Sequence, residues 1–233
     1  MLNETQRNHM RILLSESFLF DELSRAELDD IVEFTKTRNV KAREVIVRKA
    51  DPGNEMFIII DGKVSLSTIS EDGKELTFGI LGKGDMFGEI SIFDNLERTA
   101  TVTSVEPTQL LILEQQHLIP FIKQNSEVAI KLLRAMALRL RYTDQLFEDA
   151  MFKQLPGRLA KKILSLASHF GQDTIDGVRI SVKLSQNDIG KMSGASRESV
   201  NKQMRVWEEE GLIRFDKGYI TINRKEELEA FIE

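Results

Sequence analysis

Cysteine is absent from the 233 residues of this chain, and several classes of site are excluded with it. Disulfides, iron–sulfur clusters and zinc sites built from thiolates all require that residue, so none of them can form here. Oxygen sensing through a cysteine-held cluster is excluded for the same reason. The composition fits a reducing compartment.

Long apolar runs are missing too. No stretch approaches the roughly eighteen apolar residues that a membrane helix needs. The first residues, Met-Leu-Asn-Glu-Thr-Gln-Arg-Asn-His-Met-Arg, lack the apolar core of a signal peptide. We therefore expect a soluble, cytoplasmic protein that does not use a membrane.

Acidic charge dominates only part of the chain. The net charge of −5 argues against a general nucleic-acid coat protein. Residues 156–233 nevertheless hold 13 Lys and Arg against 12 Asp and Glu, so the acidic excess lies in the first part. The second part has a local basic cluster of the kind that a DNA-reading surface needs, made by Lys191, Arg197, Lys202 and Arg205.

The chain is long for one ordinary domain and comfortable for two. Residues 37–114 alternate short apolar runs with turn signals, which predicts many short strands in a sandwich or rolled barrel. We expect the Asp-Gly pairs at 61–62 and 72–73 to form tight hairpin turns. Ahead of this region, Ser24–Phe34 has an N-cap, a capping-box Glu27 and helical spacing. The predicted strands are Val45–Val47, Met56–Ile60, Val64–Ile69, Glu75–Ile80 and Thr101–Leu113.

A stretch of twenty residues within that region, GKGDMFGEISIFDNLERTAT, contains the parts of a phosphate-binding site. Gly88 lets the backbone approach an anion, the helical turn at Ile90 points N–H groups at it, and Arg98 adds a guanidinium fork. Thr99 can supply one neutral donor. Glu89 would repel a phosphate, so we expect it to accept a hydrogen bond from a sugar hydroxyl of the same ligand. The alternative is that the glycines only form turns and the arginine is a surface charge.

Residues 126–151 contain no Gly or Pro and follow a helical period. Six residues recur at alternating steps of three and four, which predicts a heptad seam. They are Leu133, Met136, Leu140, Thr143, Phe147 and Ala150. Because charged residues such as Arg139 flank the seam, we expect this helix to pair with its copy in a homodimer. The alternative is a helix packed on its own domain. Pro156-Gly157 is expected to break the helix and mark a domain boundary.

Two short helices and a turn are predicted between residues 185 and 211. Ser185 with Asp188 makes a capping-box start, Ser193-Gly194 permits a sharp turn, and Ser196 caps the second helix. The buried stripe of the second helix is Val200, Met204 and Trp207. Its outward residues, placed to meet DNA bases in the major groove, are Arg197, Glu198, Asn201, Lys202 and Arg205, with Ser196 at its start. Residues 212–222 are expected to form the hairpin of a winged helix-turn-helix.

The twenty-residue stretch resembles the phosphate-binding cassette of cyclic-nucleotide-binding domains, and the order of parts resembles the bacterial cyclic-AMP receptor protein and FNR superfamily over nearly the whole chain. The similarity is greatest to the cyclic-AMP receptor branch. It implies an α+β fold: a jelly-roll (double-stranded β-helix) cyclic-nucleotide-binding domain with N-terminal helices over residues 1–125, a dimerisation helix over 126–152 and a winged helix-turn-helix over 153–233.

The same resemblance implies roles for individual residues. Glu89 takes the ribose hydroxyl, Arg98 and Thr99 hold the cyclic phosphate with Gly88 and Ile90 beside them, and Thr143 meets the adenine amine. The residue supplied across the dimer is typically Ser, whereas here it is Asp144, whose carboxylate accepts from an adenine or a guanine amine. Several cyclic-GMP-selective modules have Thr at the position of Thr99. On the recognition helix, Arg197 and Glu198 match the family pattern, whereas Lys202 replaces an arginine and should read its base less strictly.

These roles imply a transcription factor rather than an enzyme, with cyclic AMP as allosteric effector and cyclic GMP as the other candidate. Its expected partners are a second copy of the chain, double-stranded DNA with a two-fold symmetric operator, and RNA polymerase, for which the loop Gly171–Gly177 is a candidate contact.

Two alternative functions are considered: a transcription regulator with a different effector, and an enzyme. The first is the same architecture responding to haem, another metabolite or no effector. Haem is disfavoured because His9, His117 and His169 are the only histidines and none has a second ligand at metal spacing. The second is an enzyme or a regulatory subunit of one, for which no Ser-His-Asp, paired-carboxylate or Walker arrangement is present.

Overall fold

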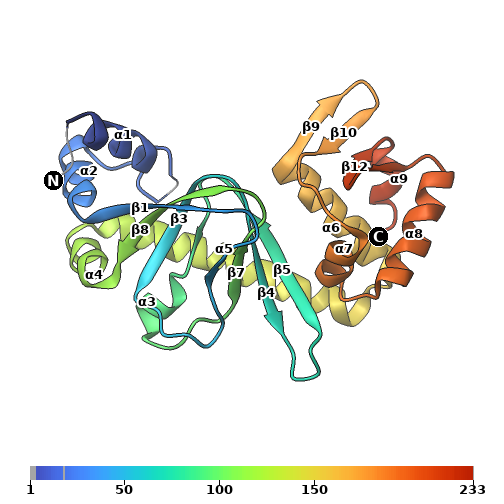
Figure 1. Cartoon of the computed structure of the whole chain (residues 1–233), viewed down its shortest axis with the longest axis horizontal. Coiled ribbons are helices and arrows are strands. Elements are labelled where there is room, and N and C mark those ends of the chain that lie inside the picture. The colour runs from blue at the N-terminus through green and yellow to red at the C-terminus, as the bar shows by residue number, and fades with distance from the viewer. Residues whose placement is uncertain (1–3, 18, 233) are drawn as a thin grey trace. The chain divides into compact units, whose positions relative to one another are not determined.

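The computed structural model describes residues 4–17 and 19–232 (Figure 1). Contacts divide the chain into two compact units. The first consists of Met1–Thr68 and Phe78–Leu140, and the second of Ile69–Thr77 and Arg141–Glu233.

Two antiparallel sheets form the β-roll of the first unit, with strand orders β1-β8-β3-β6 and β2-β7-β4-β5. The strands are β1 (Thr35–Val40), β2 (Val45–Val47), β3 (Glu55–Asp61), β4 (Val64–Ile69), β5 (Glu75–Leu81), β6 (Met86–Phe87), β7 (Thr101–Ser104) and β8 (Thr108–Glu114). The helices beside them are α1 (Glu4–Ser15), α2 (Arg25–Phe34), α3 (Ile90–Asp94), α4 (Gln115–Gln124) and α5 (Ser126–Phe152).

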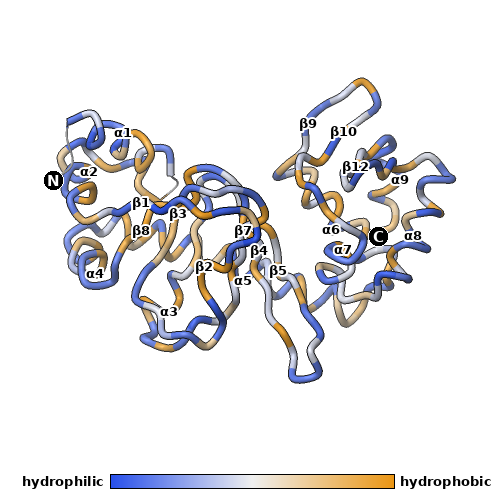
Figure 2. The backbone as a smooth tube through the Cα atoms, in the orientation of Figure 1, coloured by the Kyte–Doolittle hydropathy of each residue, from blue (hydrophilic) through white to orange (hydrophobic). Residues whose placement is uncertain are grey.

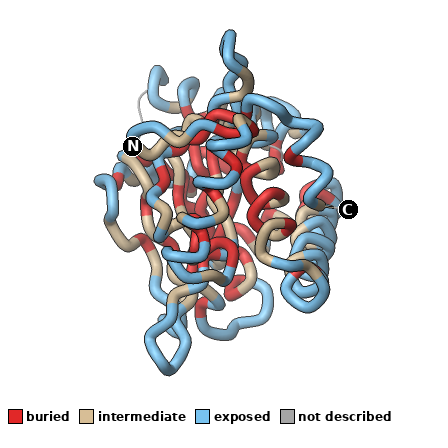
Figure 3. The backbone as a smooth tube through the Cα atoms, turned by 90° about the vertical axis from the view of Figure 1, so that its right-hand side faces the viewer, coloured by how far each residue is buried: buried red, intermediate tan, exposed pale blue. Residues whose placement is uncertain are grey.

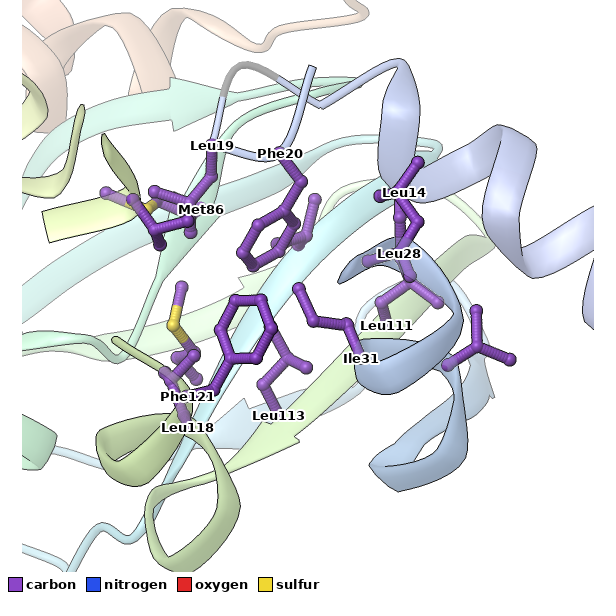
Figure 4. Close-up of a cluster of buried hydrophobic side chains, with 14 of the residues drawn as sticks. Leu14, Leu19, Phe20, Leu28, Ile31, Met86, Leu111, Leu113, Leu118 and Phe121 are labelled. Carbon is purple, nitrogen blue, oxygen red and sulfur yellow. The ribbon is translucent and has the colours of Figure 1, made fainter. Parts of the chain in front are cut away.

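The side chains of strand β3 point alternately to the two faces of its sheet and so contribute to two separate hydrophobic cores. Its five central residues are all buried, because successive side chains point to opposite faces of the sheet and both faces are covered. Met56, Ile58 and Ile60 pack with residues of α1, α2, α4 and the start of α5. Phe57 and Ile59 pack between the two sheets. Figure 4 shows the first of these cores, with Leu14, Phe20, Ile31, Leu113 and Phe121 converging from different elements.

Several sequence predictions for the roll are confirmed. The strands at 45–47, 56–60, 64–69 and 75–80 are present to within one residue. Ser24 caps α2, and its side chain and that of Glu27 form the reciprocal capping box. The pair at 72–73 lies in the turn of the β4–β5 hairpin, a polar loop in Figure 2.

Two predictions for the roll are wrong. The pair at 61–62 does not form a hairpin, because β3 and β4 belong to different sheets and the chain passes between them there. The predicted strand 101–113 is two strands, β7 and β8, which also pair in different sheets. The turn signal at 61–62 is real, since Gly62 has φ +91°, but in both cases strand pairing is decided by distant partners.

Helix α5 is continuous over 27 residues, close to the prediction. Its seam stays largely open to solvent, with Leu133, Leu140 and Phe147 more than 60% exposed. Leu132 on the same helix is buried in the roll, so packing on its own domain accounts for one face of α5 only. The helix ends before Lys153, and Pro156 lies in the first turn of α6 (Leu155–Phe170) instead of in a linker. Proline is favoured there because the first helical N–H groups need no intrahelical partner.

The second unit contains the predicted helix-turn-helix and wing. Its elements are α6, β9 (Gly171–Thr174), β10 (Gly177–Ile180), α7 (Gln186–Ser193), α8 (Arg197–Glu209), β11 (Ile213–Asp216), β12 (Tyr219–Ile222) and α9 (Lys225–Glu229). One sheet has the order β11-β12-β10-β9. The prediction of a loop at Gly171–Gly177 is wrong: these residues form strand β9, a turn and the first residue of β10. Figure 3 shows most buried residues in helices and strands, with the tips of several connecting loops exposed.

Candidate functional site

Gly88 lies between β6 and α3 with φ +80°, a backbone conformation that favours glycine. A Cβ at this position would lie 2.7 Å from the Arg98 Nη1 atom and 3.1 Å from the Glu55 carbonyl oxygen. Glycine is therefore needed both for the turn and for the close approach of the arginine.

Arg98 is buried rather than a surface charge, with 6% of the residue exposed. Its Nη1 donates to the carbonyl oxygens of Glu55 and Gly88, both at 2.7 Å, and to the Ser91 hydroxyl at 2.9 Å. Its Nε is buried without a hydrogen-bond partner in the described part of the chain. Burial lowers the pKa of Arg98, and the nearby carboxylates of Glu55 and Glu89 oppose that shift. The guanidinium remains charged at neutral pH.

Glu89 has no exposed surface. Its Oε1 accepts a charge-assisted hydrogen bond from Nη1 of Arg139 on α5, and Nη2 of Arg139 donates to the Met86 carbonyl at 2.9 Å. Its Oε2 has no partner among the described residues. The charge of the buried carboxylate is thus compensated by Arg139 at Oε1, whereas Oε2 accepts no hydrogen bond from the described residues.

Sequence reasoning assigned Arg139 only to the flank of the α5 seam and missed this contact. A signal was available, because Arg139 lies four residues before Thr143 and so on the same helical face. Ser91 was missed as well. Nothing in its residue type distinguishes it from other small helix residues.

A pocket brings together five predicted site residues: Gly88, Glu89, Ile90, Arg98 and Thr99. Its remaining lining residues are Val47, Leu66, Phe87, Ser91, Ala100, Val102 and Arg139. The cavity volume is about 40 Å³, which holds a few water molecules, so a nucleotide requires lining side chains to move. Thr143 and Asp144 are not among the lining residues. They are exposed on α5, one turn beyond Arg139, in the segment assigned to the second unit.

The second candidate surface is the outer face of α8. The Ser196 hydroxyl accepts from the Ser199 N–H at 3.1 Å and so caps the helix, as predicted. Gly194 provides the left-handed turn after α7, and Val200, Met204 and Trp207 are buried, also as predicted. The outward side chains of Arg197, Glu198, Lys202 and Arg205 are exposed.

Asn201 differs from those four because it is half-buried. Its Oδ1 accepts from the Gln186 side-chain amide of α7 at 3.1 Å. Six residues of this face line a shallow hollow of about 370 Å³: Glu198, Asn201, Lys202, Arg205, Val206 and Glu209.

Within residues 4–17 and 19–232, no helix is long and apolar enough to cross a membrane. The same residues contain no group of three or more His, Cys, Asp or Glu side chains that could hold a metal ion.

Comparison with known proteins matches both parts of the chain to families. Residues 37–125 match the cyclic nucleotide-binding domain, and residues 157–231 match the Crp-like helix-turn-helix domain. The CRP-like cAMP-activated global transcriptional regulator of Mycobacterium tuberculosis is 36% identical over 183 residues, covering 78% of this chain and 82% of the relative.

Solved structures agree with the fold. The Thermus thermophilus catabolite activator protein is 28% identical with a TM-score of 0.54, over 93% of this chain and 98% of that one. The c-di-GMP responsive global regulator CLP of Xanthomonas campestris has a TM-score of 0.75 at 18% identity, over 85% and 99% of the two chains, and shows likeness of fold alone. A cyclic-nucleotide-binding β-roll, a long helix and a Crp-like helix-turn-helix occur here in one chain, and the relatives that it matches are transcription regulators, not enzymes. The chain belongs to the CRP/FNR family of transcription regulators.

Proposed function

We propose that this protein is a homodimeric transcription factor in which cyclic AMP, bound in the β-roll, enables sequence-specific binding to DNA. One observation carries the proposal. Glu89 and Arg98 line the same pocket, and each keeps one buried polar atom, Oε2 and Nε, without a partner in the described residues. Buried polar atoms are rarely left unsatisfied, so such a pair favours a ligand that supplies a donor to one and an acceptor to the other.

A cyclic nucleotide meets both needs. Its ribose hydroxyl donates to Oε2 of Glu89, and its phosphate oxygen accepts from Arg98, in a place where burial strengthens the charge-assisted contact. Thr99 adds a hydroxyl, and the backbone at Gly88 and Ile90 adds N–H donors. A carboxylate beside a phosphate is unfavourable unless its charge is offset, and the guanidinium of Arg139 on Glu89 provides that offset.

Cyclic AMP is the preferred effector because the Mycobacterium tuberculosis relative is described as cAMP-activated. In this proposal Thr143 and Asp144 contact the base. Cyclic GMP is the second candidate, since the Asp144 carboxylate is exposed and accepts equally from a guanine amine.

The dimer forms along α5. Leu133, Leu140 and Phe147 recur every seven residues, and burying their exposed side chains against a second copy contributes favourable free energy at roughly 25 cal/mol per Å² of apolar surface. Two subunits then present two α8 helices to half-sites of a symmetric operator. We propose that RNA polymerase is contacted by the β9–β10 hairpin and that the protein acts in the cytoplasm.

Effector control requires that effector binding and DNA binding be thermodynamically coupled, and two titrations test this coupling. Calorimetry with cyclic AMP and with cyclic GMP measures effector binding, and fluorescence anisotropy with a symmetric operator measures DNA binding with and without the effector. Arg98→Gln should abolish effector binding and its enhancement of DNA binding. Arg38→Gln, which removes an arginine from an exposed ion pair on β1, serves as the matched control and should leave both unchanged. Absence of binding to either nucleotide by the unaltered protein would sink the proposal.

A further inference from the structure

We propose that Ser91 positions Arg98 for the effector: its hydroxyl helps to fix Nη1 of the guanidinium, which reserves the Nε–H and Nη2–H edge for the phosphate. This inference rests on the proposed function and deepens it by naming a residue that tunes affinity. Ser91 is distinct from the residues expected to contact phosphate or ribose through their side chains.

The hydrogen-bond donors of Arg98 are unevenly engaged. Nη1 carries two hydrogens, yet three acceptors lie within 2.9 Å of it, so it is fully engaged by the protein. Every side-chain hydrogen bond of Arg98 among the described residues runs through this nitrogen. The remaining N–H groups, on Nε and Nη2, point along one edge of the planar group, and that fork matches two phosphate oxygens.

The three acceptors around Nη1 differ in origin. Two are backbone carbonyls, of Glu55 on β3 and of Gly88, and the fold fixes both. Only the third is a side chain. The Ser91 hydroxyl, in a residue that is 2% exposed, accepts from Arg98 and donates its own hydrogen to the Gly88 carbonyl at 3.2 Å. The Ser91 hydroxyl therefore has a partner for its own hydrogen and also accepts a hydrogen bond from Nη1 of Arg98.

The loop at Gly53 packs closely against Arg98 and Ser91. A Cβ on Gly53 would lie 2.3 Å from Nε of Arg98 and 2.5 Å from Oγ of Ser91, so the backbone of this loop closes over both groups. The loop is itself tied to the arginine, because the Ala50 N–H donates to the Arg98 carbonyl and the Arg98 N–H to the Asp51 carbonyl, both at 2.9 Å. A guanidinium held in this way is ordered before the ligand arrives, which reduces the entropic cost of binding.

Removing the hydroxyl should loosen the guanidinium and weaken the binding of cyclic nucleotides. We expect Ser91→Ala to raise the Kd for cyclic AMP about tenfold, the scale of one hydrogen bond to a charged group. Ser104→Ala is the matched control. Ser104 is also 2% exposed and hydrogen-bonded, but to Lys41 and Glu44 and away from the pocket. Its removal should change the Kd less than about twofold, and circular dichroism melts of both variants report folding.

Two further measurements distinguish a role of Ser91 in positioning Arg98 from a role in stability alone. In an Arg98→Lys background, Ser91→Ala should change the Kd less than about twofold, because lysine has no fork to orient. The second measurement is the ratio of affinities for the Rp and Sp phosphorothioate analogues of cyclic AMP. It should change in Ser91→Ala and stay constant in Ser104→Ala, since it reports how the arginine meets each phosphate oxygen.

Equal affinity of Ser91→Ala and the unaltered protein would overturn the inference and leave the proposed function standing. An equal loss in the Arg98→Lys background, or an unchanged Rp to Sp ratio, would overturn it as well. Failure of the unaltered protein to bind either cyclic nucleotide would overturn the proposed function and this inference together.

Discussion

The contact of Arg139 with Glu89 gives a prediction whose size follows from the structure. Arg139→Met keeps the apolar stem but removes the cation, which leaves a carboxylate with no exposed surface uncompensated and the Met86 carbonyl without this donor. Breaking a buried ion pair costs about 3–5 kcal/mol. The Arg139 side chain is 31% exposed, so water screens part of the interaction and we expect a loss of about 2–3 kcal/mol.

Urea denaturation followed by circular dichroism measures this loss. Arg134→Met, an exposed residue of the same helix, is the control and should change the free energy of unfolding by less than about 0.5 kcal/mol. The double variant Glu89→Gln with Arg139→Met should be less destabilised than the two single changes added together, by about 2 kcal/mol. A loss below about 0.5 kcal/mol for Arg139→Met, or strict additivity in the double variant, would refute the reasoning.

Four further variants test helix α8, its buried stripe and the capping of α2. Arg197→Ala should remove sequence specificity in anisotropy measurements but leave nucleotide binding intact, whereas Lys202→Arg should tighten discrimination at one base pair, because arginine pairs with guanine through two bonds. Trp207→Ala should destabilise the protein by about 3–5 kcal/mol in urea titrations, because the side chain is fully buried. Hydrogen bonds from the Ser24 hydroxyl and backbone hold the pKa of Glu27 below its ordinary value. A depressed pKa stabilises the folded state above the ordinary pKa of glutamate, and this contribution is lost as pH falls, so Ser24→Ala should show a shallower fall in melting temperature between about pH 7 and about pH 3.5.

Features that depend on neighbouring residues were predictable from the sequence. The capping boxes at Ser24 and Ser185, the left-handed turn at Gly194 and the buried stripe ending at Trp207 all appear as expected. Each depends on a bond or a spacing within a few residues. Gly88, Glu89, Ile90, Arg98 and Thr99, which line one pocket, were predictable from the short segment that contains them, whereas Ser91 in the same segment was not.

Features that depend on distant partners were not. The turn after β3 contains the predicted positive-φ glycine, Gly62, yet the strands on its two sides pair with β8 and β7 in different sheets. Likewise, the residue that neutralises Glu89 lies fifty positions away. The spacing from Thr143 places Arg139 on the same helical face as a predicted site residue, but only the packing of α5 on the roll brings it to Glu89.

The β9–β10 hairpin has a practical consequence for spectroscopy. Its tip residue, Ile175, is fully exposed, and the pairing of β10 with β12 attaches the hairpin to the rest of the sheet. Since the chain has no cysteine, Ile175→Cys would introduce a unique thiol for a fluorophore or a spin label. The label would sit clear of the sheet's packed side chains and report on whatever molecule approaches the hairpin.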